Sequence, residues 1–188
     1  MSWQALSDQV RGCTRCPSLV ATRTTVVVGT TSPGARLLVV GEAPGAQEDA
    51  TGRPFVGRSG QLLDRLLAEA GLPRDRVSVL NTLKCRPPGN RVPTRIETTN
   101  CRPWTEAQVA LLDPWLVLAL GLSATRWWLA EGQGEPVTLG AVRGQVQDVG
   151  GRRVLPTYHP SAALRGGPAG EPMRLLREDL ALAVRLVA

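Results

Sequence analysis

Long hydrophobic runs are missing from this 188-residue sequence. No apolar stretch approaches the roughly 20 residues that a membrane-spanning helix needs, so membrane-spanning classes are excluded. Residues 1–10 are polar and amphipathic and lack the apolar segment of a secretory leader. We therefore expect a cytoplasmic protein with no membrane partner. The length suits a single domain over residues 1–188 with a substantial core.

Lysine is almost absent. Of 22 basic residues only Lys84 is a lysine, and the formal net charge is +6. Such an excess of arginine indicates an anionic partner, because the planar guanidinium group matches the geometry of phosphate. Histidine and phenylalanine occur once each, as His159 and Phe55.

Cysteine occurs only four times, at positions 13, 16, 85 and 101. In a reducing compartment such a set indicates a metal or redox site rather than disulfides. Cys13 and Cys16 form a C-x2-C pair, and Cys85 and Cys101 lie far downstream. Four thiolates suit zinc or an iron–sulfur cluster, and the spacing does not distinguish them. The site would be structural and tie the N-terminal segment to residues 86–100; the alternative is four unrelated buried thiols.

The stretch from Gly41 to Gly57 is an unusually long connection between a predicted strand and a predicted helix. Glycines would let the backbone approach a flat ligand, and Phe55 could stack on that ligand. The alternative is a surface loop built from turn residues.

The remaining pattern alternates between apolar strands and amphipathic helices. Predicted strands cover residues 26–28 at a sheet edge, 37–40 and 77–80 in the centre of the sheet, and 115–120, 142–149 and 153–157. Predicted helices cover residues 3–11, 59–70, 95–112, 123–130 and 171–187. This order predicts an α/β fold with a parallel sheet covered on both faces. Ligands bind beyond the carboxyl ends of such strands, where Glu42, Asn81 and His159 fall.

Several separated motifs, together with the four cysteines, resemble the family 4 (type 4) uracil-DNA glycosylases. They are Gly41-Glu42-Ala43-Pro44-Gly45, Glu48-Asp49, Pro54-Phe55-Val56-Gly57, Asn81, Lys84-Cys85-Arg86-Pro87-Pro88-Gly89-Asn90-Arg91 and Tyr158-His159-Pro160-Ser161. The resemblance implies a three-layer αβα sandwich with a central four-stranded parallel sheet. It also implies a [4Fe-4S] cluster on Cys13, Cys16, Cys85 and Cys101, and hydrolysis of the N-glycosidic bond of uracil in DNA during base excision repair. The implied uracil pocket consists of Gly41, Glu42, Ala43, Phe55, Asn81 and His159.

The chemistry of these residue types agrees with that implication. Phe55 can stack on uracil, and the Asn81 amide can read an acceptor beside an N–H group. His159 can donate to uracil O2 as charge develops there, and Glu42 can orient water or stabilise a cationic sugar. Glu48 and Asp49 are expected only to order the loop.

On the DNA side, the expected contacts are arginines that the cluster braces and one apolar wedge. Arg86, Arg91, Arg95 and Arg165 are expected to contact DNA, and Leu164 is expected to fill the vacated base stack. The substrate would be uracil-containing DNA, single- or double-stranded, and the protein a monomer.

The sequence also bears on the type of reaction. Strand cleavage by a glycosylase needs an amine, and Lys84 is expected to be held beside the cysteines, which predicts a monofunctional enzyme. No histidine lies between Glu42 and His159, so the enzyme should turn over rather than trap its DNA. The alternatives are a cluster-based electron carrier and a non-catalytic nucleic-acid-binding module.

Overall fold

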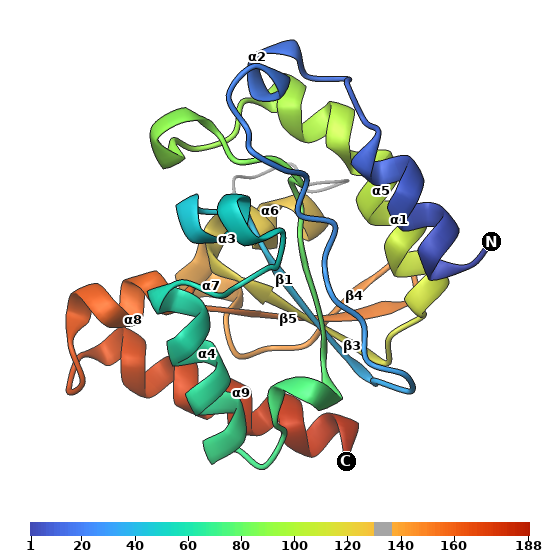
Figure 1. Ribbon diagram of the computed structural model, residues 1–188. Helices are drawn as coiled ribbons and strands as arrows, with labels where there is room; N and C mark the ends of the chain where they lie inside the picture. Colours follow the sequence, from blue (N-terminus) through green and yellow to red (C-terminus); the bar gives the residue numbers. More distant parts are fainter. Residues whose placement is uncertain (130–136) are drawn as a thin grey trace.

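In the computed structural model, which describes residues 1–129 and 137–188, the chain folds around a twisted β-sheet (Figure 1). The order across the sheet is β2-β1-β3-β5-β4. The strands are β1 (Leu37–Gly41), β2 (Ser78–Asn81), β3 (Leu116–Leu120), β4 (Gln147–Val149) and β5 (Arg152–Thr157). The first four strands in that order run parallel, and β4 pairs with β5 in the opposite direction.

The prediction of a four-stranded sheet was therefore incomplete. The four parallel strands are present, but β4 adds a fifth, antiparallel strand at one edge. Gly150 and Gly151 both have positive φ, at 58° and 80°, and together they reverse the chain between β4 and β5.

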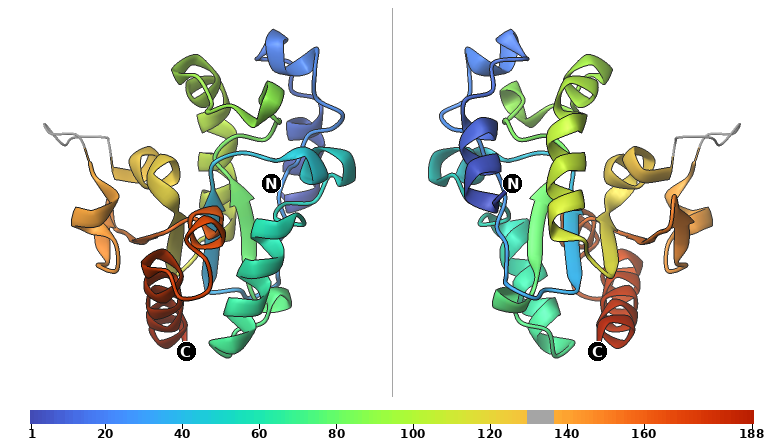
Figure 2. Two further views of the ribbon diagram at one scale, coloured as in Figure 1. Left: turned by 90° about the vertical axis from the view of Figure 1, so that its left-hand side faces the viewer. Right: turned by 90° about the vertical axis from the view of Figure 1, so that its right-hand side faces the viewer.

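Helices cover both faces of the sheet (Figures 1 and 2). They are α1 (Trp3–Arg11), α2 (Pro17–Val20), α3 (Ala46–Thr51), α4 (Arg58–Glu69), α5 (Arg95–Leu112), α6 (Gly121–Leu129), α7 (Leu139–Val142), α8 (Pro160–Gly166) and α9 (Glu171–Val187), with 3-10 turns η1 (Arg74–Arg76) and η2 (Pro88–Asn90). One apolar cluster joins α4, α8 and α9 to one face, and a second joins α5 and α6 to the other. None of the described helices is both long enough and apolar enough to span a bilayer.

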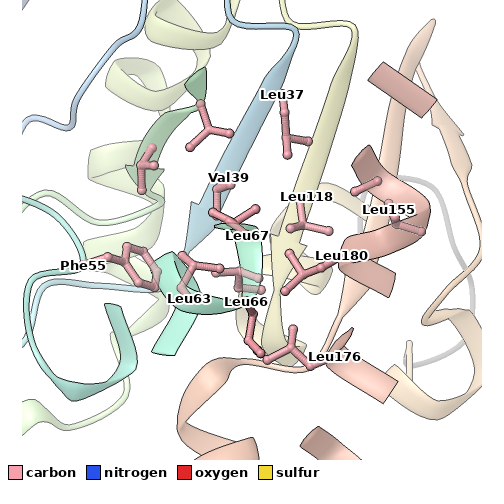
Figure 3. Packing of buried hydrophobic residues seen from close by; sticks show 14 of the residues in the cluster. Leu37, Val39, Phe55, Leu63, Leu66, Leu67, Leu118, Leu155, Leu176 and Leu180 are labelled. Carbon is pink, nitrogen blue, oxygen red and sulfur yellow. The ribbon is translucent and has the colours of Figure 1, made fainter. Parts of the chain in front are cut away.

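Alternate residues of the inner strands enter the two clusters. Leu37 and Val39 of β1 pack on the α4 side, and Leu38 and Val40 pack on the α5 side. A strand that is buried on both faces must be apolar throughout, which explains the continuous apolar run. Figure 3 shows the α4 side, with Phe55 beside the carboxyl end of β1.

Three strand predictions were wrong. Residues 26–28 form no strand. The chain from Val27 to Thr30 nevertheless lies alongside β2 and the residues after it, with a Val27 N to Lys84 O hydrogen bond of 2.8 Å and an isolated bridge from Thr30 to Val79. Strand β2, expected to be central, is an outer strand. Residues 142–149 contain the end of α7 and only the short β4. Ala130, the expected end of the helix from Ser123, lies outside the described residues.

Candidate active site

A cleft of about 620 Å³ opens at the carboxyl ends of β1, β2, β3 and β5. The predicted pocket residues Glu42, Ala43, Phe55, Asn81 and His159 all line it. These residues are far apart in sequence. The parallel strands bring them together because Asn81 ends β2, His159 follows the end of β5, and the others lie in the connection after β1. The cleft is therefore the candidate active site.

Phe55 lines the cleft with its backbone in an unusual, left-handed conformation. Its φ is 53°, in the left-handed region that a non-glycine residue seldom adopts. Gly60 allows this, because a Cβ there would overlap the backbone of Phe55. Gly41 has a matching role: a Cβ there would meet both the Phe55 ring and the Asn81 amide oxygen. Gly41 thus lets the ring and the amide approach one another, although it does not itself line the cleft. Backbone strain of this kind gathers at functional sites.

Glu48 organises the connection after β1. Its carboxylate accepts hydrogen bonds from the backbone N–H groups of Gly45 at 3.1 Å, Val56 at 2.8 Å and Gly57 at 2.8 Å. These bonds join the start of α3 to the segment that follows Phe55. The neighbouring carboxylate of Asp49 is buried and accepts from the backbone N–H groups of Thr24 and Thr25. Both acidic residues therefore order backbone, as the sequence predicted.

Asn81 presents an amide with open hydrogen-bonding capacity. The side chain is buried, and its Oδ1 has no hydrogen-bond partner in the described part of the chain. An unpaired buried acceptor is costly, so such an atom in a cleft points to a ligand that donates to it. The backbone carbonyl of Asn81 is held from the other side, by the Lys84 ammonium at 2.6 Å.

His159 is held as a neutral ring with a defined tautomer. Burial, with a smaller contribution from the charge of Arg165, lowers the pKa of His159 to about 4. Its Nδ1 accepts a hydrogen bond of 3.1 Å from the backbone N–H of Ser161. The proton of the neutral ring must then be on Nε2, which leaves an N–H donor on the ring's other nitrogen. The ring centroids of His159 and Phe55 are 5.9 Å apart.

Glu42 supplies a carboxylate beside these groups. It lines the cleft and is half-buried. Its backbone carbonyl is fixed by Thr82 Oγ1 at 2.8 Å and Leu83 N at 2.9 Å. No described residue hydrogen-bonds to its carboxylate, which is therefore available to a water molecule or a substrate.

Of the residues predicted to contact DNA, only some line the cleft. Arg165 and Arg91 line the cleft, and Arg86 donates to Asn90 Oδ1 at 2.7 Å. The Arg91 guanidinium already binds the buried carboxylate of Glu97 through two hydrogen bonds, at 2.6 and 2.9 Å. Those bonds are the main reason that the pKa of Glu97 falls to about 2. Leu164 does not line the cleft and packs in part against the core.

The four cysteines lie around one small, largely apolar cavity. None of the four forms a disulfide, and burial raises the pKa of Cys101 to about 11 and also raises the pKa values of Cys16 and Cys85. In the described residues no three His, Cys, Asp or Glu side chains are arranged to hold a single metal ion.

Three N–H donors point at these sulfur atoms. Arg23 lies 3.0 Å from the Sγ of Cys85, Trp104 lies 3.2 Å from that of Cys13, and Asn100 lies 3.7 Å from that of Cys16. Donors directed at sulfur favour the thiolate form, which is the form that binds metal.

Two residues that support His159, namely Ser161 and Gly121, were assigned no role from the sequence. Ser161 was part of a motif, but its control of the His159 tautomer depends on the turn into α8. Gly121, with a φ of 82°, packs closely against His159. A glycine directly after a buried strand was the available signal for it.

Comparison with known proteins identifies the family. The family model described as "Uracil DNA glycosylase superfamily" matches residues 28–181. A "Type-4 uracil-DNA glycosylase" of Thermotoga maritima is 43% identical over 178 residues, which cover 94% of this chain and 90% of the relative. A Type-4 relative from Saccharolobus solfataricus is 37% identical, with 93% and 81% covered. A "Type-5 uracil-DNA glycosylase" of Thermus thermophilus is 35% identical, with 86% and 88% covered. The chain therefore belongs to the uracil-DNA glycosylase superfamily and, within it, to the type-4 family.

Proposed function

We propose that this protein hydrolyses the N-glycosidic bond of uracil in DNA, releasing free uracil and leaving an abasic site for base excision repair. The observation that carries the proposal is the Asn81 amide, which is buried at the cleft and whose Oδ1 has no hydrogen-bond partner among residues 1–129 and 137–188. The type-4 and type-5 relatives bear the names of uracil-DNA glycosylases, which supports the same conclusion.

Recognition of uracil follows from two side chains. Uracil presents N3–H beside the acceptor O4, and the Asn81 amide can accept from the first through Oδ1 and donate to the second through Nδ2. Phe55 supplies a ring on which the base stacks. A base inside a duplex cannot reach such a pocket, so the nucleotide must rotate out of the stack before it binds.

Bond cleavage would use His159 and Glu42. As the bond between N1 and C1′ breaks, its electron pair moves onto the uracil ring and O2 becomes negative. The Nε2–H of neutral His159 would donate to that oxygen and stabilise the transition state. The Glu42 carboxylate would stabilise the cationic sugar and orient the water whose oxygen bonds to C1′. The proton that this water loses passes to solvent or to the departing base.

The enzyme is proposed to be monofunctional. Opening the sugar by a Schiff base requires a free amine near C1′. Lys84 is the only lysine, and its ammonium group is fully buried against the Asn81 carbonyl. Burial lowers the pKa of Lys84 to about 8, but the group has no route to the sugar. Abasic sites should therefore accumulate without nicks.

The cysteine residues fit an iron–sulfur cluster. Cys13, Cys16, Cys85 and Cys101 would hold a [4Fe-4S] cluster, supported by their common cavity and by the N–H donors from Arg23, Trp104 and Asn100. When bound, the cluster would supply structural cross-linking rather than redox chemistry. It would tie the N-terminal segment and α5 to the loop of residues 86–94, and so brace Arg86 and the backbone that follows it.

Other features of the proposal concern DNA contacts and assembly. Arg86 and Arg165 are proposed to contact phosphates on the two sides of the cleft. Arg91 is proposed to act mainly through its ion pair with Glu97, which shapes the rim. A monomer with a cytoplasmic location stays a prediction, and light scattering with and without DNA tests its first part.

The direct test is incubation with an oligonucleotide that contains a single uracil. We expect the strand to break at the uracil only after alkali or heat. Borohydride added during the reaction should trap no protein–DNA adduct. Binding to the oligonucleotide without alkali-sensitive sites would instead indicate a non-catalytic binding module.

A further inference from the structure

Two aliphatic side chains stand in solvent beside the cleft. Val92 and Ile96 are 68% and 73% exposed, and among the exposed large apolar side chains of the described residues only Met1 is more exposed. Val92 lies in the segment that joins η2 to α5, directly after Asn90 and Arg91, which line the cleft, and Ile96 lies in the first turn of α5. Val92 therefore lies on the rim of the proposed uracil pocket. Figure 1 shows this segment projecting on the same side of the molecule as α3 and α8.

The backbone around Val92 is firmly held. Pro93 follows it, which restricts Val92 to extended conformations. Arg91 donates to the Val92 carbonyl at 3.1 Å and, with the same guanidinium, binds both carboxylate oxygens of Glu97. Glu97 in turn accepts from the backbone N–H of Thr94 at 2.8 Å, which caps α5. A fixed backbone thus holds an apolar side chain out in water.

The surroundings of Val92 indicate what covers it. Arg95 follows Val92 by three residues, and Arg86 donates to Asn90 in the same loop, so we expect a partner that combines an apolar surface with negative charge. Stacked bases between phosphates have that combination. When a nucleotide rotates into the cleft, it leaves a gap in the stack, and an apolar side chain at the rim can fill that gap.

We propose that Val92 is the wedge that enters the base stack vacated by the flipped uracil, with Ile96 packing against the neighbouring base or sugar. This inference rests on the proposed function and assigns a residue of the same site. It replaces Leu164 as the expected wedge, because Leu164 packs in part against the core cluster and does not line the cleft.

The test compares uracil excision from single-stranded and duplex oligonucleotides of the same sequence, under single-turnover conditions. A wedge matters only where a stack must be kept open. Val92→Ser should therefore lose about tenfold or more in duplex excision rate and less than about twofold on the single strand. Val92→Leu keeps an apolar side chain at this position and should excise uracil from the duplex at the wild-type rate. Val146→Ser, at another exposed valine away from the cleft, should match wild type on both substrates.

Four results would overturn the inference in distinguishable ways. Equal duplex rates for Val92→Ser and wild type would overturn the wedge alone, as would a duplex-specific loss in Leu164→Ser that Val92→Ser does not share. Equal losses of Val92→Ser on both substrates would show a role in the pocket rather than in the stack. A wild-type protein that excises uracil from neither substrate would overturn the proposed function itself, and the wedge with it.

Discussion

Asn81 is the residue on which base recognition most depends. Asn81→Asp replaces an amide donor with an anionic acceptor, so the uracil O4 loses a hydrogen bond and faces a charge. We expect excision to fall by at least about tenfold, which corresponds to about 1.4 kcal/mol of transition-state stabilisation. Binding to undamaged DNA should barely change.

A matched control is available in the same cleft. Asn90 also lines it but is exposed, and its amide oxygen is engaged by Arg86 rather than directed at the base. Asn90→Asp should therefore keep most of the excision activity. If Asn81→Asp lost excision and binding to undamaged DNA in the same proportion, Asn81 would be supporting the fold and not reading the base.

His159 should titrate far below an ordinary histidine. Its pKa is lowered from 6.5 to about 4, so the ring is neutral throughout the neutral range. Because the folded-state pKa is depressed, its contribution to stability is present above about pH 6.5 and is lost progressively as the pH falls toward 4. Protonation at Nδ1 would also break the hydrogen bond from Ser161 N.

NMR can follow this titration directly, because an untagged chain contains a single imidazole. The midpoint should lie near pH 4. Arg165→Gln should raise it, since the charge of Arg165 contributes to lowering the pKa, whereas Arg177→Gln, an exposed arginine on α9, should not. A midpoint near 6.5 in the wild-type protein would contradict the buried neutral ring.

The residues that carry chemistry could be predicted from the sequence, but several of their supports could not. Phe55, Asn81 and His159 follow strands or a glycine-rich connection, which are local signals. The positive φ of Phe55, the close approach at Gly60 and the Nδ1 contact from Ser161 depend on backbone geometry in three dimensions. Residue types alone do not encode that geometry.

At the scale of elements, local signals worked where they were strong. Helix α5 begins at Arg95, where the helix over residues 95–112 was predicted to begin, and the capping box of Thr94 and Glu97 stabilises that start. The apolar run before Gly41 is β1. Strand β2 was predicted to be central although it is an outer strand. Residues 26–30 cover its outer edge, so its residues are all buried, as those of a central strand would be. The short helices α2, α3, α7 and α8 were missed because they have too few turns for a periodic pattern.

The connection through α3 depends on Glu48. Glu48→Ala would leave the backbone N–H groups of Gly45, Val56 and Gly57 without their acceptor. We expect a loss of about 1–3 kcal/mol in the free energy of unfolding. Excision should fall as well, because the backbone after Phe55 is no longer held. Hydrogen exchange over residues 45–57 should become faster.

Glu69→Ala provides the comparison. Glu69 is an exposed acidic residue whose only ion pair among the described residues is with Arg177, and such surface pairs contribute little. Unfolding, excision and exchange should all stay close to wild type. If Glu48→Ala were indistinguishable from Glu69→Ala, the carboxylate of Glu48 would not be what orders the connection.

At the scale of the whole molecule, the cysteine cavity joins distant parts of the chain. Residues from α1, the segment at 26–28 and α5 form a third apolar cluster that includes Cys85 and Cys101. If the proposed cluster forms there, the purified protein should be brown and contain about four irons per chain. Cys101→Ala should lower solubility and thermal stability before it changes the chemistry at the cleft.

Thr99→Ala, at an exposed position of the same helix, should leave both colour and stability unchanged. Iron analysis, visible absorbance and thermal unfolding of the three proteins give the comparison. A colourless, fully active wild-type protein that contains one zinc would refute the [4Fe-4S] assignment while leaving the proposed reaction intact.

The central claim is that this chain releases uracil from DNA. Its net charge of +6 suits an anionic substrate, and the open cleft offers a place for the base. The most direct measurement is mass spectrometry of the small molecules released from a duplex with one uracil, alongside a count of abasic sites in the same sample. We predict free uracil and abasic sites in equal amounts, with unbroken strands before alkali. Release of no free base, or strand breaks without free uracil, would contradict the account.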